Sequence, residues 1–206
     1  MTPDTARDIL ALASAPRPPR TPGRHRALLW VSVAALAIVA ALVAATLPAH
    51  SEGATVAGSA STIDGDTIDV GHVRIRLEGI DAPEHDQTCK DAAGADWACG
   101  EASTDAMRGM VEGLPVLCRE VGKDKYKRIL ALCWPLDAAG TPAEPSVNER
   151  LVLQGLAVSF VRYSHQFDAA EAIARDAKAG IWSGSFEFPW DFRARARALA
   201  AAAEGN

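Results

Sequence analysis

The residues of this chain best suited to chemistry are three carboxylates and an arginine in its first half. Asp66, Asp81 and Glu84 offer oxygen ligands for a hard metal ion and a base for a water molecule, and Arg76 offers a guanidinium group for a phosphate. A second arginine, Arg128, follows in a charged segment further along the chain. Together such groups can stabilise the charge that develops when water attacks a phosphodiester. The sequence therefore predicts phosphodiester hydrolysis.

Strand-like alternation around these residues predicts how they are positioned. Residues 59–77 alternate between apolar and polar types, with a break at Gly65 and a turn at Gly71-His72. Within Val73-Arg74-Ile75-Arg76-Leu77 the period is two, so the apolar side chains face one side and both arginines face the other. We expect the apolar side to form the core and the arginine side to line solvent or a site.

The downstream sequence predicts two further strands, at 115–120 and 128–134, around a charged turn. The short apolar segment 156–161 is expected to extend the sheet, and 82–100 to form a polar loop. Helical patterns cover 101–112, 147–154, 167–178 and 191–203. About five strands with interspersed helices favour an α+β fold, and a small barrel with about three flanking helices fits this order.

Two of these helices carry more detailed predictions. In the first, Ala102, Ala106, Met110 and Val111 are the expected inner face. The second should be capped by Ser146 and stopped at Gly155.

An apolar run near the N-terminus predicts a membrane segment. Ala27 to Thr46 comprises 20 residues without a charge. At about 1.5 Å per residue, such a run can span a hydrocarbon core of roughly 30 Å. A signal peptide cleaved at Leu47-Pro48-Ala49 and a buried helix are the alternatives, but the run is long for a signal peptide and a long polar segment precedes it. We favour an uncleaved transmembrane anchor over residues 27–49.

The flanks of this run predict its orientation and the division of the chain. Residues 1–26 are rich in arginine and proline, which predicts a disordered basic tail on the cytoplasmic side. Residues 50–58 are expected to be a linker, 59–183 the folded domain and 184–206 a helical extension, all periplasmic or extracellular, or secreted if the run is cleaved. The formal net charge is −5, and the tail contributes +3 from five arginines and two aspartates, which leaves −8 for the rest. Most nucleic-acid binders are basic.

All four cysteines follow the apolar run. An even number in an oxidising compartment predicts two disulfides. Of the three pairings, we favour Cys89–Cys99, which one short loop joins, and Cys118–Cys133, which flank a hairpin. A zinc site is the alternative, although no C-x-x-C spacing supports it.

Several short motifs resemble the staphylococcal-nuclease-like, or thermonuclease, family. They occur in the family's order over about residues 55–183 and are Ile63-Asp64-Gly65-Asp66-Thr67, Arg74-Ile75-Arg76-Leu77, Gly79-Ile80-Asp81-Ala82-Pro83-Glu84, Asp124-Lys125-Tyr126 with Arg128, Asn148-Glu149-Arg150-Leu151-Val152 with Gln154-Gly155-Leu156-Ala157, and Gly180-Ile181-Trp182. The resemblance implies an OB-fold barrel with helices beside it. It does not extend to the apolar run or to the residues after Trp182.

The resemblance also implies a calcium site. Asp66 and Asp81 correspond to the family's two calcium-binding aspartates, and the backbone carbonyl of Ala82 would be a third ligand. Ligands that are all oxygens suit calcium better than zinc. Two carboxylates are few for a strong site, so we expect weak metal affinity unless substrate phosphate completes the coordination shell.

The remaining roles concern the substrate. Glu84 corresponds to the general base, and Arg76 and Arg128 to the two phosphate-binding arginines. Residues implied to contact the nucleotide or its base are Lys125, Tyr126 and Tyr163. One departure is Lys127, which stands where the family commonly has glycine and could redirect the loop that carries Arg128.

These observations predict a monomeric, membrane-anchored, calcium-dependent nuclease that cuts DNA, RNA or both with low sequence specificity. The acidic domain and Lys127 motivate the alternative, a catalytically weak or inactive OB-fold module that binds nucleic acid or protein at the cell envelope.

Overall fold

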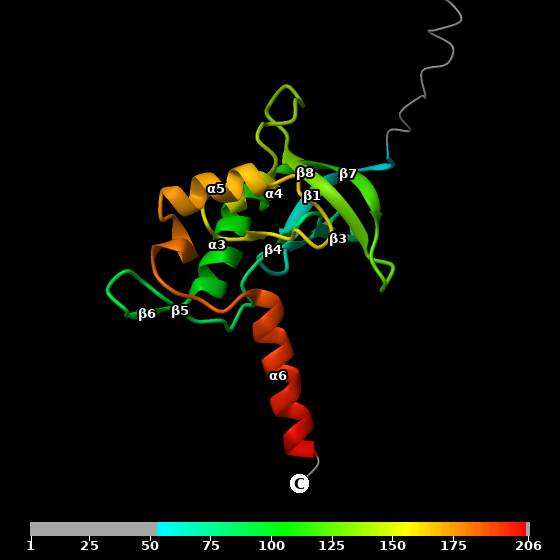
Figure 1. Cartoon of the computed structure of the whole chain (residues 1–206). Helices are drawn as coiled ribbons and strands as arrows, with labels where there is room; N and C mark the ends of the chain where they lie inside the picture. The colour runs from blue at the N-terminus through cyan, green and yellow to red at the C-terminus, as the bar shows by residue number, and fades with distance from the viewer. Residues whose placement is uncertain (1–52, 205–206) are drawn as a thin grey trace, which may run out of the picture. The chain divides into compact units, whose positions relative to one another are not determined.

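The computed structural model describes residues 53–204, in which five strands close into a barrel (Figure 1). The strands are β1 (Thr55–Thr62), β2 (Thr67–Val70), β3 (Val73–Leu77), β7 (Pro115–Lys123) and β8 (Ile129–Pro135). Their order around the barrel is β1-β2-β3-β8-β7, and β7 pairs back onto β1. Only the β3–β8 pair is parallel among these strands. The expected α+β architecture with an OB-type barrel is therefore confirmed.

The barrel interior is filled by the apolar side of each strand. Ile75 and Leu77 on β3 are buried as the alternation predicts, while Val73 is half-buried at the strand's start. Val116 and Cys118 on β7 and Ala131 and Cys133 on β8 are fully buried against them. Because successive strand residues point to opposite faces, this arrangement leaves Arg74 and Arg76 on the outer face of β3.

Four α-helices accompany the barrel in residues 53–204. They are α3 (Cys99–Val111), α4 (Val147–Leu153), α5 (Asp168–Asp176) and α6 (Pro189–Glu204), and a short 3-10 helix, η2, covers Gly180–Ser183. The Ser146 hydroxyl accepts a hydrogen bond from the Glu149 amide at 3.2 Å, as its predicted capping role requires. Gly155 follows with a φ of +63°, which ends α4 in the expected place.

The inner face of α3 is shifted by one position from the predicted one, and Val111 is the only one of the four predicted residues that is fully buried. Ser103, Met107 and Val111 form its buried stripe, whereas Ala102, Ala106 and Met110 are only partly buried. The apolar pattern missed this face because one member is a serine, whose hydroxyl donates a hydrogen bond to the Leu156 carbonyl at 2.7 Å.

Two short sheets lie outside the barrel, and each differs from a sequence prediction. β5 (Cys89–Lys90) pairs with β6 (Asp96–Trp97) inside the segment expected to be loop only. β9 (Val158–Ser159) does not extend the barrel but pairs with β4 (Ile80–Asp81). In this pair Asp81 lies opposite Val158, which fixes the acid just beyond the end of β3.

The start of the domain also needs correction. β1 begins at Thr55, within the segment 50–58 that the sequence predicts as linker, because residues 55–58 pair with β7. The predicted membrane segment, 27–49, and the predicted basic tail, 1–26, lie outside the described residues. Across residues 53–204, no helix is both long enough and apolar enough to cross a bilayer.

Asn148, at the start of α4, ties that helix to the barrel. Its side chain is fully buried, and its amide nitrogen donates to the carbonyls of Glu78 at 2.9 Å and Ala131 at 3.1 Å. Its amide oxygen accepts from the Cys133 backbone at 3.1 Å. These bonds hold the exit of β3 against β8, and hence position the residues that lead into Asp81.

Aromatic side chains attach the first turn of α6 to the domain. The ring of Trp190 stacks between Phe188, at 4.6 Å, and Phe160, at 5.5 Å, measured between ring centroids. The Gln87 side-chain amide donates to the Glu187 carbonyl at 2.6 Å. Beyond this turn α6 projects away from the barrel (Figure 1), and its later residues are exposed.

Both predicted disulfides are formed. Cys89–Cys99 joins β5 to the first residue of α3, and Cys118–Cys133 links directly opposed residues of β7 and β8. The residues described include no free cysteine.

We predict that the Cys118→Ala/Cys133→Ala double variant loses about 2–4 kcal/mol of unfolding free energy, because the crosslink restricts the unfolded chain and both sulfurs are buried in the barrel. Urea unfolding of the oxidised protein and of the variant measures the difference. Adding reductant should lower the midpoint of the wild-type protein and leave the midpoint of a variant without any cysteine unchanged. Identical wild-type midpoints with and without reductant would contradict the prediction.

Candidate active site

The first acid of the site, Asp66, ends the tight turn between β1 and β2. The Asp64 carboxylate accepts from the Asp66 amide at 3.0 Å, which shapes the turn. Gly65 lies so close to α3 that an added Cβ would be 2.3 Å from the Ser103 hydroxyl, so only glycine fits. The turn therefore packs tightly on α3 and holds Asp66 in a buried position with 4% of its surface exposed.

Arg76 connects Asp66 to Asp81. From the outer face of β3 it donates to both Asp66 oxygens, at 2.8 and 2.7 Å, and to Asp81 Oδ1 at 2.8 Å. Asp81 is completely buried. Two buried carboxylates that share one guanidinium are close neighbours, so the structure brings together three of the residues that the sequence predicts for the site.

Glu84 completes the acidic group from the loop after β4. Its backbone amide donates to the Gln87 side chain at 3.2 Å, and its carboxylate is about one third exposed. Close packing against the first turn of α3 fixes this loop, because a Cβ on Gly100 would lie 1.7 Å from the Glu84 carbonyl oxygen. Glu84 is thus the most solvent-accessible carboxylate of the three, as a base that must reach water should be.

Burial and charge act in opposite directions on these groups. Burial raises the pKa of Asp66 to about 7, and Arg76 opposes that rise. Burial alone would lower the pKa of Arg76, but Asp66 and Asp81 raise it above its ordinary value. Asp66 is therefore a carboxylate whose ionised form depends on its cationic partner, Arg76.

The donor set fits a small hard cation, with a limited number of protein ligands. Asp66, Asp81 and the Ala82 backbone can supply oxygens only, which suits calcium or magnesium. Guanidinium groups already act as cations at these carboxylates, so the pair attracts positive charge. Within residues 53–204, no cluster of three or more His, Cys, Asp or Glu side chains is arranged to hold a metal ion. A metal here would depend on two carboxylates, a carbonyl, water and substrate.

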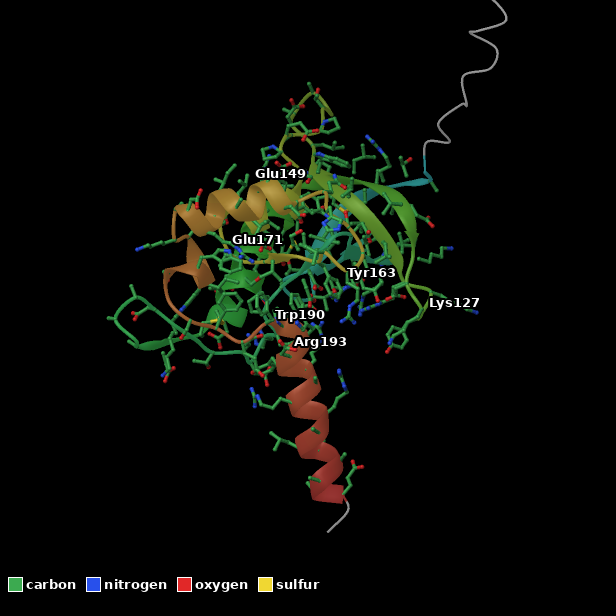
Figure 2. All side chains as sticks on the ribbon, in the orientation of Figure 1. Lys127, Glu149, Tyr163, Glu171, Trp190 and Arg193 are labelled. Carbon is green, nitrogen blue, oxygen red and sulfur yellow. A yellow bond between two sulfur atoms is a disulfide. The ribbon has the colours of Figure 1, made fainter. Side chains whose placement is uncertain are left out.

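A residue that the sequence does not predict also enters the site. Arg193 on α6 donates to Asp81 Oδ2 at 2.7 Å, to Asp81 Oδ1 at 3.1 Å and to Glu84 Oε1 at 2.6 Å. Figure 2 shows Arg193 and Trp190 at the end of α6 that meets the domain. The arginine-rich composition of residues 193–197 was visible in the sequence, but no pattern connected it with acids more than 100 positions earlier.

Arg128, Lys125 and Tyr126 lie in the turn between β7 and β8. The Arg128 side chain donates to Asp124 at 2.7 Å, and its guanidinium lies 5.7 Å from the Tyr126 ring centre. The Lys125 ammonium lies 4.9 Å from the same ring. Tyr126 itself is 68% exposed, so this turn presents a cationic, aromatic surface to solvent.

Lys127 gives that turn an unusual backbone. Its φ is +66°, in the left-handed region that favours glycine. The turn therefore keeps the shape that glycine would adopt, and Arg128 follows it directly into β8. In that strand Leu130 pairs with Arg76.

Tyr163 lies in the loop after β9. It is 70% exposed, and its ring meets the edge of Phe160 at 4.9 Å between centroids. Because Phe160 also stacks on Trp190, Tyr163 is connected through two rings to the base of α6.

Comparison with known proteins identifies relatives over most of the domain. The family model described as staphylococcal nuclease homologue matches residues 74–184. A protein named "Succinoglycan biosynthesis protein ExoI", from Rhizobium meliloti (strain 1021), is 35% identical over 148 residues, which are 70% of this chain and 74% of that protein.

Two further relatives carry nuclease names. An "Uncharacterized endonuclease" from Escherichia coli is 34% identical over 140 residues, or 65% of this chain and 81% of that protein. A "Micrococcal nuclease" from Shigella flexneri is 30% identical over 142 residues, or 64% of this chain and 76% of that protein. The family match covers more than half of the sequence and includes Arg76, Asp81 and Glu84, and the chain therefore belongs to the family of staphylococcal nuclease homologues.

Proposed function

We propose that the chain is a calcium-dependent nuclease that hydrolyses DNA, RNA or both with low sequence specificity. Membership of its family makes it a phosphodiester hydrolase. The observation that carries the proposal is that three carboxylates are linked through two guanidinium groups at the edge of the barrel. Arg76 binds Asp66 and Asp81, and Arg193 binds Asp81 and Glu84.

The side chains divide the work by their chemistry. Asp66, Asp81 and the Ala82 carbonyl would hold calcium, and a bound calcium ion would neutralise negative charge on a phosphate oxygen. Arg76 offers a planar pair of N–H donors to the same phosphate. Glu84, the most accessible of the three acids, accepts the proton of the attacking water. Lys125, Tyr126 and Tyr163 offer exposed charge and rings for the flanking nucleotides.

Low sequence specificity follows from which groups face the substrate. The proposed contacts are to phosphate and to ring faces, and such contacts do not distinguish base edges. The net negative charge adds a further expectation: binding is weak because the protein repels the strand, and it falls as salt rises because the proposed contacts are to phosphates.

We predict that Glu84→Gln lowers kcat about 10²–10⁴-fold, since the amide cannot accept a proton. Arg76→Ala should lower kcat at least about 10²-fold, because it removes preorganised donors to the charge that develops on the phosphate. Cleavage of a supercoiled plasmid and of a labelled RNA measures both effects. Arg74→Ala is the matched control, because Arg74 lies two residues along the same strand, is exposed and pairs with Asp69 at 2.7 Å. Full activity of Glu84→Gln would refute the assigned role.

A second prediction concerns the cation. Calcium at ten times its dissociation constant should stabilise the folded state by about 1.4 kcal/mol, through preferential binding to it. Asp81→Asn should abolish both this gain in stability and calcium-dependent cleavage. Asp69→Asn, which removes a partly exposed carboxylate that pairs with Arg74 instead of Arg76, should retain both. Thermal unfolding in calcium and in chelator gives the measurement, and equal melting temperatures for the wild-type protein under both conditions would exclude the site.

We further propose that residues 27–49 anchor the enzyme in the membrane, with the domain outside the cytoplasm. The supporting features are the length of the apolar run and the arginines before it. The full chain should remain in the membrane fraction after an alkaline wash, and protease added outside should remove the domain. A soluble mature protein that begins near residue 50 would instead identify a cleaved signal peptide.

A further inference from the structure

The contacts of Arg193 are unusual for a residue outside the matched family region. The family match ends at residue 184, yet Arg193 makes three hydrogen bonds to Asp81 and Glu84. Together with Arg76 it leaves no carboxylate oxygen of Asp81 without a cationic donor. Any cation that binds Asp81, and any water that uses Glu84 as a base, must compete with this guanidinium.

The backbone of Arg193 is held beside the site. Trp190, three residues earlier, is stacked between Phe188 and Phe160, and Phe160 directly follows β9, the partner of the strand that carries Asp81. The buried Gln87 binds the backbone just before α6 and also holds the Glu84 amide. The helix start is thus tied to the same loop and sheet as the acids, and a flexible arginine side chain can change its partner without moving the helix.

The charge of the site indicates which kind of group Arg193 would bind in place of the carboxylates. Arg128, the second phosphate-binding arginine that the resemblance implies, is paired with Asp124. Burial of Asp124 would raise its pKa, but hydrogen bonds from Arg128 stabilise the carboxylate and the pKa is lowered. Asp66, Asp81 and Glu84 carry more negative charge than Arg76 alone can balance. Arg76 and the proposed calcium ion together only neutralise the three acids, so a second guanidinium is what would give the site a net positive charge for an anion. Among residues 53–204, Arg193 is the arginine bound to these acids besides Arg76.

We propose that Arg193 is a substrate-binding residue that exchanges Asp81 and Glu84 for the phosphate when nucleic acid enters. Its fork of N–H donors suits two phosphate oxygens as well as it suits the carboxylates that it now holds. Release of Glu84 in the same exchange frees the base that the reaction requires. The inference rests on the proposed nuclease function and assigns part of its substrate binding to α6.

The test measures binding separately from cleavage. A fluorescein-labelled phosphorothioate single strand, chosen because it resists hydrolysis, is titrated into the full chain with calcium present, and anisotropy is followed at several salt concentrations. Arg193→Ala should weaken binding about 10- to 100-fold, the effect of losing a charged hydrogen-bonding partner. The slope of log K against log salt should fall by about 0.7, which corresponds to one phosphate contact on a single strand.

Two further variants separate phosphate recognition from general charge and from folding. Arg193→Lys keeps the charge but loses the fork, so the salt slope should be retained while affinity recovers only in part. Arg197→Ala removes an exposed arginine one turn further along α6 and should change neither quantity. If Arg197→Ala weakens binding as much as Arg193→Ala does, the proposal is overturned and a diffuse charge effect explains the result. Urea unfolding of each variant identifies any loss that reflects destabilisation.

The proposal and the function on which it rests fail differently. If Arg193 only obstructs the acids, Arg193→Ala should bind calcium more tightly in calorimetry, bind the phosphorothioate strand at least as well and cleave faster. That result would overturn the proposal and leave the nuclease function intact. If the wild-type protein does not cleave nucleic acid at all, the nuclease function fails, while the phosphorothioate titration still reports whether Arg193 contacts phosphate.

Discussion

The site depends on one constraint: a fully buried carboxylate, Asp81, must be matched by positive charge. Removing an ionised carboxylate from water costs several kcal/mol unless donors surround it. Asp81 lies on a short strand that no solvent reaches, and Asp66 is buried beside it. Arg76 and Arg193 supply the compensating charge from two different parts of the chain. The same demand for positive charge makes the pair suited to a divalent cation, since a preorganised anionic site exists before any ion arrives.

The barrel topology is what keeps the two aspartates together against their mutual repulsion. Asp66 comes from a turn that Gly65 allows to touch α3, and Asp81 comes from a strand that β9 pairs from outside the barrel. Arg76 lies between them because β3 pairs with β2 on one side and with β8 on the other. Asn148 then fixes the exit of β3 through three hydrogen bonds. Substrate-independent packing therefore does the positioning, so little reorganisation is needed when a ligand binds.

Part of this arrangement could be predicted from the sequence, because it depends on residues that are close together along the chain. Alternation over residues 73–77 indicates which face of the strand carries Arg76, and the motifs on either side place Asp66 and Asp81 at adjacent strand ends. Cysteine number and loop length favoured the disulfide pairs that form. The predicted inner face of α3 was one position off, because the buried Ser103 is held by a hydrogen bond and does not appear in an apolar pattern. Arg193 could not be predicted, because its contact with Glu84 spans 109 positions and depends on how aromatic rings seat α6.

Arg128, which the resemblance implies as a phosphate ligand, and Arg193, which we propose as one, differ in their electrostatic surroundings, although both are paired with carboxylates in this structure. Arg128 belongs to an exposed turn, and its carboxylate partner, Asp124, lies in the same turn and accepts hydrogen bonds from the Tyr126 and Arg128 amides as well. The hydrogen bonds to Asp124 all come from its own turn, so the pair with Arg128 is stable without any group from the acidic site. Asp81 and Glu84 instead hold Arg193 within an acidic group that also attracts cations, so each positive charge added there weakens their hold on the arginine. Competition of this kind favours transfer of Arg193 to an incoming phosphate, and it relates the acidity of the site to its capacity to receive an anion.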